Sequence, residues 1–455
     1  MGFVLSVLYL VTYYLSPVTV FGPLATFHIE LILAVLVIGI SLPKLIQSSI
    51  LKTPQSLALL GLALAVFLSI LIGMHWFGRA AYSILIFIPN AFPYFLVCLH
   101  CDTRKKLKVL VAMLLFVCLF VIVRGCIDLH RGVPAGTSIQ TAVMGTTYVI
   151  PQINDAGETI YRLRGMGEIN DPNDFGQLLV CVIPLLLIFW RTKKMGSNIV
   201  MVVLPICALL CGIFFTHSRG ALLALIAVLL VAARRRIGTL PSLLIAVVVY
   251  IAAMALHFTG GRDISTESGY DRLGLWGSGL ELLKSHPLFG VGYGNLADFL
   301  GLTAHNSVVV CAAELGGFGL FFWCLFLFPT VRDTLVVASA NQVGEGEPIV
   351  AEDGMFPQEA RKIESLDKAE INRLGRLMLL SLTGFLVAGW FLSRAFVVTL
   401  FMLGGMAEVV FQMALDRGMI ASRMRFARVL PYAGILAVAL VMMMYILLRV
   451  TNLTR

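Results

Sequence analysis

The stretch NIVMVVLPICALLCGIFFTHSRGALLALIAVLLVAARRR, residues 198–236, decides the class of fold. Its two apolar runs, near 198–217 and 219–233, are separated only by a short turn around Ser218, and Arg234-Arg235-Arg236 follows the second run. A helix needs roughly 20 apolar residues to cross the hydrocarbon core of a bilayer. We therefore predict two transmembrane helices joined by a tight turn.

The same pattern recurs along the whole chain of 455 residues, which is 59% hydrophobic and only 13% charged. Soluble domains are nearer a quarter charged. Because lipid leaves a backbone to satisfy its own hydrogen bonds, and no regular alternation suggests a β-barrel, we predict an all-α polytopic membrane protein. About 12–13 helices are expected, since further apolar runs lie near 3–21, 26–47, 56–77, 81–101, 108–128, 174–190, 240–258, 305–330, 376–394, 396–415 and 429–449.

The distribution of lysine and arginine predicts the orientation of these helices. With the N-terminus in the cytoplasm, the six inward loops hold 22 of the 34 basic residues. This bias is typical of cytoplasmic loops, so the net charge of +9 indicates membrane topology and not a nucleic-acid partner. Two long extracytoplasmic loops follow, 130–172 and 259–304; neither contains cysteine, and no disulfide framework is expected.

These boundaries divide the chain into four parts. We expect N-terminal transmembrane helices over 1–129 and a core over 130–330 whose two outer loops carry the active site. A polar cytoplasmic connector over 331–375 and C-terminal transmembrane helices over 376–455 complete the chain.

Two polar segments at the predicted outer face suggest a site for an anion. In the first, Asp171 or Asn173 is expected to cap a helix that begins at Pro172, and the positive end of that helix lies close to Arg164. In the second, Arg219 stands in the outward turn, against the positive-inside bias. A plain turn would not need an arginine there.

Two further segments lie in and after the second outer loop. Leu273, Trp276, Leu280 and Leu283 share one helical face, which predicts a short helix at the outer interface with Trp276 as its interfacial anchor. Pro287 should end this helix, and Gly290, Gly292 and Gly294 should form a bent connector. Where the chain re-enters the membrane, His305 has a side chain suited to general-base chemistry. A cap or packing role for His305 is the alternative.

Together these segments resemble the O-antigen ligase and O-antigen polymerase superfamily over about 160–325. The resemblance rests on an ordered set of motifs: Arg164-Gly165 with Asp171-Pro172-Asn173, Ser218-Arg219-Gly220, Arg272 with Trp276, the stretch His286–Asn295, Ala304-His305-Asn306-Ser307, and Glu314-Leu315-Gly316-Gly317.

The resemblance implies that a glycan moves from a polyprenyl (undecaprenyl) diphosphate carrier to an acceptor hydroxyl at the periplasmic face of the bacterial inner membrane. His305, Arg219 and Arg272 are expected to be catalytic, with the histidine deprotonating the acceptor and the arginines stabilising the diphosphate. The expected substrate-binding residues are Arg164, Asp171, Asn173, Trp276 and Asn306. The implied reaction is metal-independent and inverting, with no cofactor. A cation held by Asp171 and Asp174 remains an alternative.

The acceptor stays open among lipid A–core, a protein and a growing polysaccharide, which correspond to a ligase, a protein O-oligosaccharyltransferase and a polymerase. A ligase is favoured. A transporter of lipid-linked glycans is the competing class, but a transporter would carry its ionisable residues near the bilayer midplane, often in repeated halves. A non-catalytic member of a glycan-assembly complex is the third possibility.

Overall fold

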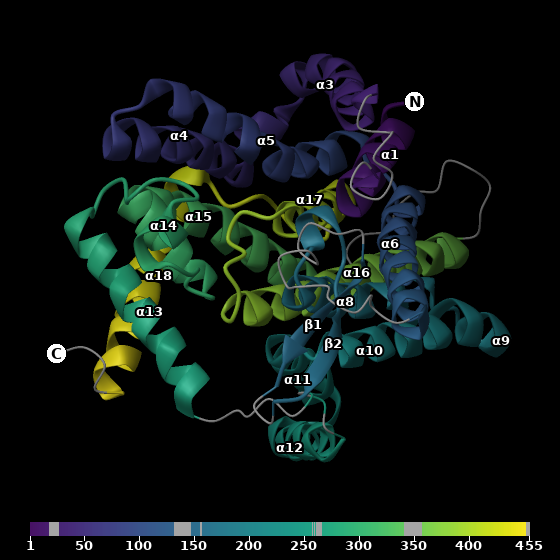
Figure 1. Ribbon diagram of the computed structural model, residues 1–455. Coiled ribbons are helices and arrows are strands. Elements are labelled where there is room, and N and C mark those ends of the chain that lie inside the picture. The colour runs from purple at the N-terminus through teal and green to yellow at the C-terminus, as the bar shows by residue number, and fades with distance from the viewer. Residues whose placement is uncertain are drawn as a thin grey trace.

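The computed structural model describes residues 1–17, 27–131, 147–154, 157–256, 258, 260, 266–340 and 357–451. Parts of the two predicted outer loops and of the connector, near 132–146, 259–265 and 341–356, lie outside the described residues. The described chain is a bundle of helices with one small hairpin of strands (Figure 1). The all-α polytopic class is therefore confirmed.

The first half of the bundle contains α1 (Gly2–Leu15), α3 (Ile29–Gln47), η2 (Ser49–Lys52), α4 (Pro54–Met74), α5 (Phe77–His100), α6 (Arg104–Arg131), α8 (Pro172–Leu186), η4 (Leu187–Phe189), α9 (Met195–Asn198), η5 (Ile199–Val203) and α10 (Leu204–Thr216). The second half contains α11 (Arg219–Ile237), α12 (Thr239–Ala255), α13 (Thr266–Ser285), α14 (Leu296–Leu300), α15 (Ser307–Ser339), α16 (Pro357–Gly389), α17 (Val398–Asp416) and α18 (Phe426–Val450).

Ten helical segments in the described part of the chain are long and apolar enough to cross a membrane. The shorter apolar helices α1 and α12, and α11 with its three terminal arginines, account for the remaining predicted spans. The polar helix α13 is not among the ten. Residues 331–339 and 357–375, expected as connector, continue α15 and begin α16 as helix.

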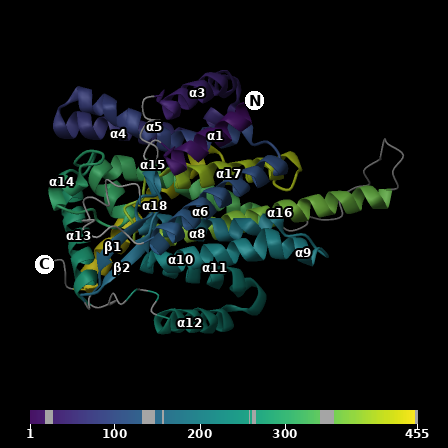
Figure 2. The ribbon, with the colours of Figure 1, turned by 45° about the vertical axis from the view of Figure 1, so that its right-hand side comes forward.

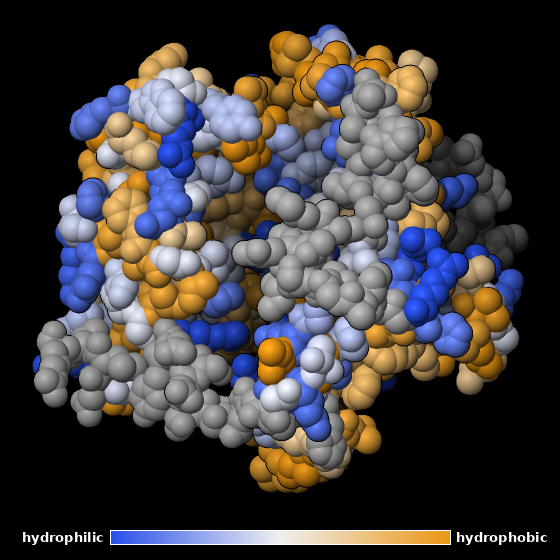
Figure 3. Space-filling view, viewed as in Figure 1, coloured by the Kyte–Doolittle hydropathy of each residue, from blue (hydrophilic) through white to orange (hydrophobic). Residues whose placement is uncertain are grey.

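The described parts of the two long loops lie at one end of the bundle. This end, which we call the hairpin end, carries α13, α14 and the antiparallel strands β1 (Val149–Ile153) and β2 (Thr159–Leu163), in which Val149 pairs with Leu163 (Figure 2). The start of α16 projects at the opposite end, where Arg104 pairs with Asp367. Seen from the hairpin end, the surface is hollowed between α13 and the strands (Figure 3).

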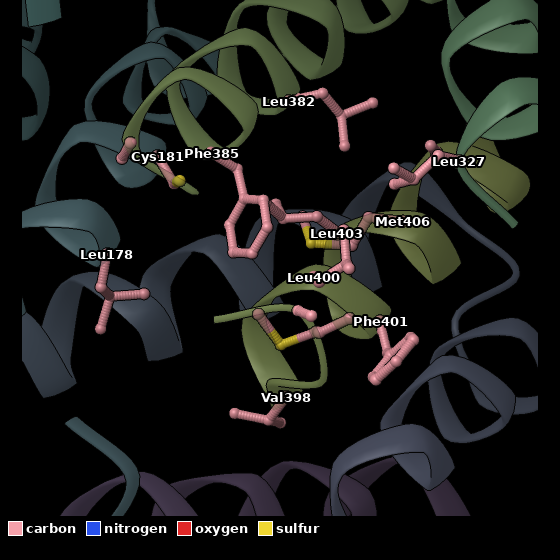
Figure 4. Close-up of a cluster of buried hydrophobic side chains, with 14 of the residues drawn as sticks. Leu178, Cys181, Leu327, Leu382, Phe385, Val398, Leu400, Phe401, Leu403 and Met406 are labelled. Carbon is pink, nitrogen blue, oxygen red and sulfur yellow. The ribbon is translucent and has the colours of Figure 1, made fainter. Parts of the chain in front are cut away.

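Helix α17 lies at the centre of the core, and nearly all of its side chains are buried. It packs against α5, α15 and α16. Figure 4 shows part of the buried apolar cluster around it, with side chains that include Leu178, Cys181, Leu327, Leu382, Phe385, Leu400, Phe401, Leu403 and Met406. Helices α3, α12 and α18 at the periphery instead expose large apolar side chains. Such a surface suits lipid, where an apolar face needs no cover from water.

Candidate active site

His305 stands at the hairpin end, in the segment that leads into α15. Asn306 caps this helix, since its side-chain oxygen accepts hydrogen bonds from the N–H groups of Val308 and Val309 at 2.9 and 3.1 Å. The amide nitrogen of Asn306 donates to the Trp390 carbonyl at 3.0 Å. Asn306 is fully buried. Its observed contacts therefore position the backbone next to His305.

The backbone of His305 is held in an unusual conformation. Its φ of 51° lies in the left-handed region, which a non-glycine residue adopts only at a cost. The N–H of His305 donates to Ser393 Oγ at 2.8 Å, and Ser307 Oγ donates to the Leu392 carbonyl at the same distance. The α16–α17 loop thus fixes the histidine segment on both sides of His305.

Trp276 joins α13 to the same segment. Its indole N–H donates to the Ala304 carbonyl at 2.8 Å, and its ring meets that of Trp390 edge to face at 6.2 Å. Trp276 is only 5% exposed, so its interpretation as an interfacial anchor was wrong: a ring at the membrane interface would be open to it. The predicted apolar face of α13 is confirmed, since Trp276 and Leu280 are buried, and the helix ends before Pro287.

Arg272 lies one turn before Trp276 on α13 and is half-buried. Burial lowers the pKa of its guanidinium, and the positive charge of Arg219 lowers this pKa further. The two arginines are therefore near enough to repel each other. An anion bound beside them would relieve that repulsion, and guanidinium groups match the oxygens of phosphates.

Arg219 is the first residue of α11, directly after the N-cap Ser218, whose Oγ accepts the Ala221 N–H at 3.3 Å. His217 closes the turn at a φ of 49°, and its Nδ1 lies 2.9 Å from the Phe258 carbonyl. The start of α11 lies close to Phe391, because a Cβ on Gly220 would meet the Cβ of Phe391 at 3.3 Å. Arg219 thus lies beside the loop that holds His305.

Arg164 and Asp171 lie in the segment that leads from β2 into α8. Asp171 caps α8 as predicted, and its Oδ1 accepts the Asn173 N–H at 2.7 Å. Burial lowers the pKa of Arg164, and the carboxylate of Asp171 acts in the opposite direction. Arg164 donates to the carbonyls of Thr147 and Asn170 at 3.3 and 3.4 Å, so its observed contacts support the loop.

The electrostatic surroundings of His305 connect these groups. Burial lowers the pKa of the His305 imidazole, the positive charge of Arg272 lowers this pKa further, and the carboxylate of Asp171 raises it. Hence His305 is neutral near pH 7, as a general base must be. His305, Arg272, Arg219 and Asp171 form one cluster of interacting charges, with Arg164 next to Asp171.

Two arginines near the cluster, the buried Arg162 and the half-buried Arg394, were not predicted from the sequence. Asn173, predicted to contact substrate, accepts a hydrogen bond at 3.0 Å from Arg162, which also donates to Gln152 and to the Thr216 carbonyl, each at 2.8 Å. Arg394 forms a bidentate ion pair with Asp174, which is 7% exposed. Arg394 stands in an outward turn, against the positive-inside bias. The same signal drew attention to Arg219 and could also have drawn attention to Arg394. This pair occupies the Asp174 carboxylate that was the alternative cation ligand.

The glycine-rich connector after α13 packs against a break in helix α15. Gly316 interrupts this helix with a φ of 66°, and the freed N–H groups of Gly317 and Phe318 donate to the carbonyls of Pro287 and Leu288 at 2.8 and 3.1 Å. The N–H of Gly292 donates to the Glu314 carbonyl at 3.0 Å. Two of the quoted motifs, His286–Asn295 and Glu314-Leu315-Gly316-Gly317, are therefore one structural unit. The bent connector at Gly290, Gly292 and Gly294 is confirmed by their positive φ angles.

Two cavities flank the histidine segment. The first, of about 490 Å³, is an apolar groove between α15, α16 and α18, and its lining runs from Ser307 and Trp390 to Arg332. The second, of about 510 Å³, is more polar than the first, although apolar side chains such as Ile70 and Phe396 also line it; it touches Thr303 and Ser393. Since Thr303 lines one cavity and Ser307 the other, the chain around His305 passes between them.

The comparisons with known proteins agree with this arrangement. Residues 204–324 match the model of a protein family described as O-antigen ligase. The matched segment contains Arg219, Arg272 and His305. No protein in the curated comparison matches the chain. The predicted resemblance to the O-antigen ligase superfamily is thus confirmed, and with it a membrane enzyme of the glycan ligase or polymerase type.

Proposed function

We propose that the chain, which carries an O-antigen ligase domain over residues 204–324, transfers a glycan from polyprenyl (undecaprenyl) diphosphate to an acceptor hydroxyl. The observation that carries this proposal is the cluster of His305, Arg272 and Arg219, brought together from three separate helix starts and loops. The site would face the periplasm from the bacterial inner membrane, since most of the basic residues belong to loops at the other end of the bundle.

The donor would bind with its tail in the apolar groove and its diphosphate beside the arginines. The groove between α15, α16 and α18 is lined almost wholly by hydrocarbon, and its outer end reaches Trp390, which contacts Trp276. Arg272 lies one turn before Trp276 on α13, with Arg219 near it. An isoprenoid tail in the groove would therefore place its diphosphate beside these two cations, with Arg164 as a third.

The chemistry is a single displacement. His305 takes the proton of the acceptor hydroxyl as its oxygen forms a bond to the anomeric carbon of the donor sugar. The bond from this carbon to the diphosphate oxygen breaks, and polyprenyl diphosphate leaves with the electron pair. Arg272 and Arg219 stabilise the negative charge that develops on it. Attack opposite the leaving group inverts the anomeric centre, and the step needs no metal ion.

The clustering of charged groups at the hairpin end of the bundle favours an enzyme over a transporter. A transporter binds its substrate near the midplane of the membrane, commonly between repeated halves. In the described part of the chain, the cluster around His305 lies at the hairpin end, where α8, α11 and α15 begin.

The test is release of polyprenyl diphosphate from a lipid-linked glycan by the purified protein in liposomes, with candidate acceptors added one at a time. We expect acceptor-dependent release by the wild type, lost in His305→Ala and Arg219→Ala. His286→Ala and Arg131→Ala, which alter exposed residues of the same type at the hairpin end, should retain it. Movement of intact substrate across the liposome, without release for any acceptor, would establish the transporter instead.

A further inference from the structure

The polar cavity beside His305 has no role in the donor chemistry described above. We call it the tyrosine cavity, after Tyr82 and Tyr293; its other polar groups include Arg79, Glu168, Glu314 and Arg394. Its volume of about 510 Å³ is in the range of small-molecule sites, which are roughly 300–1,000 Å³. It is large enough for a ligand and lies against the segment that holds the proposed base.

The guanidinium groups that line this cavity already bind neighbouring side chains. Arg394 is paired with Asp174, and Arg79 donates to Asn295 Oδ1 at 2.5 Å. The carboxylate of Glu314 accepts hydrogen bonds from the N–H groups of Gly294 and Leu296. With Asp174 counted, two guanidinium groups therefore stand against three carboxylates, because Glu168 and Glu314 also line the cavity. An anionic ligand would gain little here, in contrast to the mutually repelling Arg272 and Arg219.

The same lining suits a ligand with many hydroxyl groups. Carboxylates accept hydrogen bonds from hydroxyls and guanidinium groups donate to them. Tyr293 adds an aromatic ring held edge-on against Phe87 and tilted against Phe396, with ring centroids 6.2 and 5.5 Å apart. Burial raises the pKa of the Tyr293 hydroxyl, and Glu314 and Glu168 raise it further, so both carboxylates lie near this ring.

The position of the cavity points to the acceptor. The donor tail and diphosphate belong on the side of Ser307, Trp390 and Arg272, whereas the tyrosine cavity touches Thr303 and Ser393, and Ser393 binds the N–H of His305. An attacking hydroxyl must approach the anomeric carbon from the side away from the leaving diphosphate. The cavity lies on that side of the histidine segment.

We propose that the tyrosine cavity binds an uncharged sugar of the acceptor and directs its hydroxyl to His305. This assignment rests on the proposed function and names the acceptor class that the reaction leaves open: a glycan, and not a phosphorylated headgroup or a protein serine. Glu168 is the specificity-determining residue. It is half-buried in the cavity, so it is open to a ligand.

The experiment compares Glu168→Gln with wild type in liposomes that contain the lipid-linked donor. The acceptors are short alkyl glycosides that end in a neutral hexose or N-acetylhexosamine, the same glycosides with a phosphate on the terminal sugar, and a serine/threonine peptide. Glu281→Gln, the same change on the exposed face of α13, is the matched control. Inhibition by free polyprenyl diphosphate reports donor binding separately.

We expect wild type to use a neutral glycoside in preference to its phosphorylated form and to the peptide. Glu168→Gln should raise the KM for the neutral glycoside about tenfold, as for loss of a hydrogen bond to a charged group, with inhibition by polyprenyl diphosphate unchanged. An unchanged KM in Glu168→Gln, or preference for the phosphorylated glycoside or peptide, would overturn the assignment of the cavity to an acceptor sugar. The proposed glycosyltransferase activity would still stand. No release by wild type with any acceptor would overturn the glycosyltransferase itself.

Discussion

The indole nitrogen of Trp276 donates a 2.8 Å hydrogen bond to the carbonyl of Ala304, the residue before His305. This contact joins α13 to a segment 28 residues further along the chain, and both partners are buried. Together with the bond from His305 N–H to Ser393, it holds the histidine backbone in its left-handed conformation. Helix α13 thus helps to set the position of the proposed base.

Trp276→Phe should lower kcat about tenfold while changing inhibition by polyprenyl diphosphate little. Phenylalanine keeps most of the ring packing but leaves the buried Ala304 carbonyl without its donor, at a cost of about 1–3 kcal/mol. Steady-state release of polyprenyl diphosphate measures the effect. Trp190→Phe alters a 38% exposed ring at the opposite end and should retain full activity; an equal fall in both variants would exclude a specific role.

Asp174→Ala should destabilise the protein by about 3 kcal/mol, because it leaves the Arg394 guanidinium without its partner. Thermal unfolding in detergent gives the measurement. The double variant Asp174→Ala/Arg394→Ala carries no unpaired charge and should recover part of the loss. A double variant as unstable as the sum of the single variants would show that the two residues act independently.

The activity should fall at low pH as His305 becomes protonated, since only the neutral imidazole can accept a proton. Burial and Arg272 lower the pKa of His305, so the fall should begin below the ordinary histidine range of about 6.5. Asp171→Asn removes a charge that raises this pKa and should move the acidic limb of kcat/KM to still lower pH. Arg272→Gln should move it to higher pH, whatever its effect on the maximal rate.

Asparagine is a good N-cap, so Asp171→Asn should preserve the start of α8. The matched control is Asp298→Asn, which removes an exposed carboxylate from α14 at the same end. Both pH profiles would be recorded under identical conditions. An acidic limb that stays in place in Asp171→Asn and Arg272→Gln would mean that His305 is not the titrating base.

Short sequence patterns predicted the helices and where some of them begin, because these features depend on neighbouring residues. Apolar runs located the helices, and Asp171-Pro172 located the start of α8. The hairpin β1–β2 was not predicted, because Val149–Ile153 contains a proline and gives no clear alternation. The break at Gly316 was also missed, since two glycines inside an apolar run do not by themselves end a helix.

The residues of the candidate site also fall into two groups: those that a local pattern indicated, and those that only the packing of the helices brings together. Arg219 was singled out because an outward arginine opposes the topology bias, and His305 because its imidazole suits general-base chemistry and stands in a motif of the family resemblance. The pair Asp174–Arg394 joins residues 220 positions apart, and the tyrosine cavity combines residues of α4, α5, α14 and α15 with several connecting segments. No spacing along the chain reports such contacts, because they depend on how the helices pack.

Gly316→Ala should be the most damaging conservative change in α15. The glycine has a φ of 66°, and a Cβ there would meet the Leu288 carbonyl carbon and oxygen at 2.5 Å and Gly290 N at 2.6 Å. Backbone strain and overpacking each cost about 1–3 kcal/mol, so we expect a loss of about 3 kcal/mol or more in unfolding free energy. Gly434→Ala, in the uninterrupted α18 with no atom within 4 Å, should be neutral or stabilising by up to about 1 kcal/mol.

Because Gly316 also anchors the connector that carries Gly292 and Tyr293, Gly316→Ala at a permissive temperature should raise the KM for acceptor more than it weakens inhibition by polyprenyl diphosphate. Equal effects on both substrates would show that the break in α15 serves stability alone.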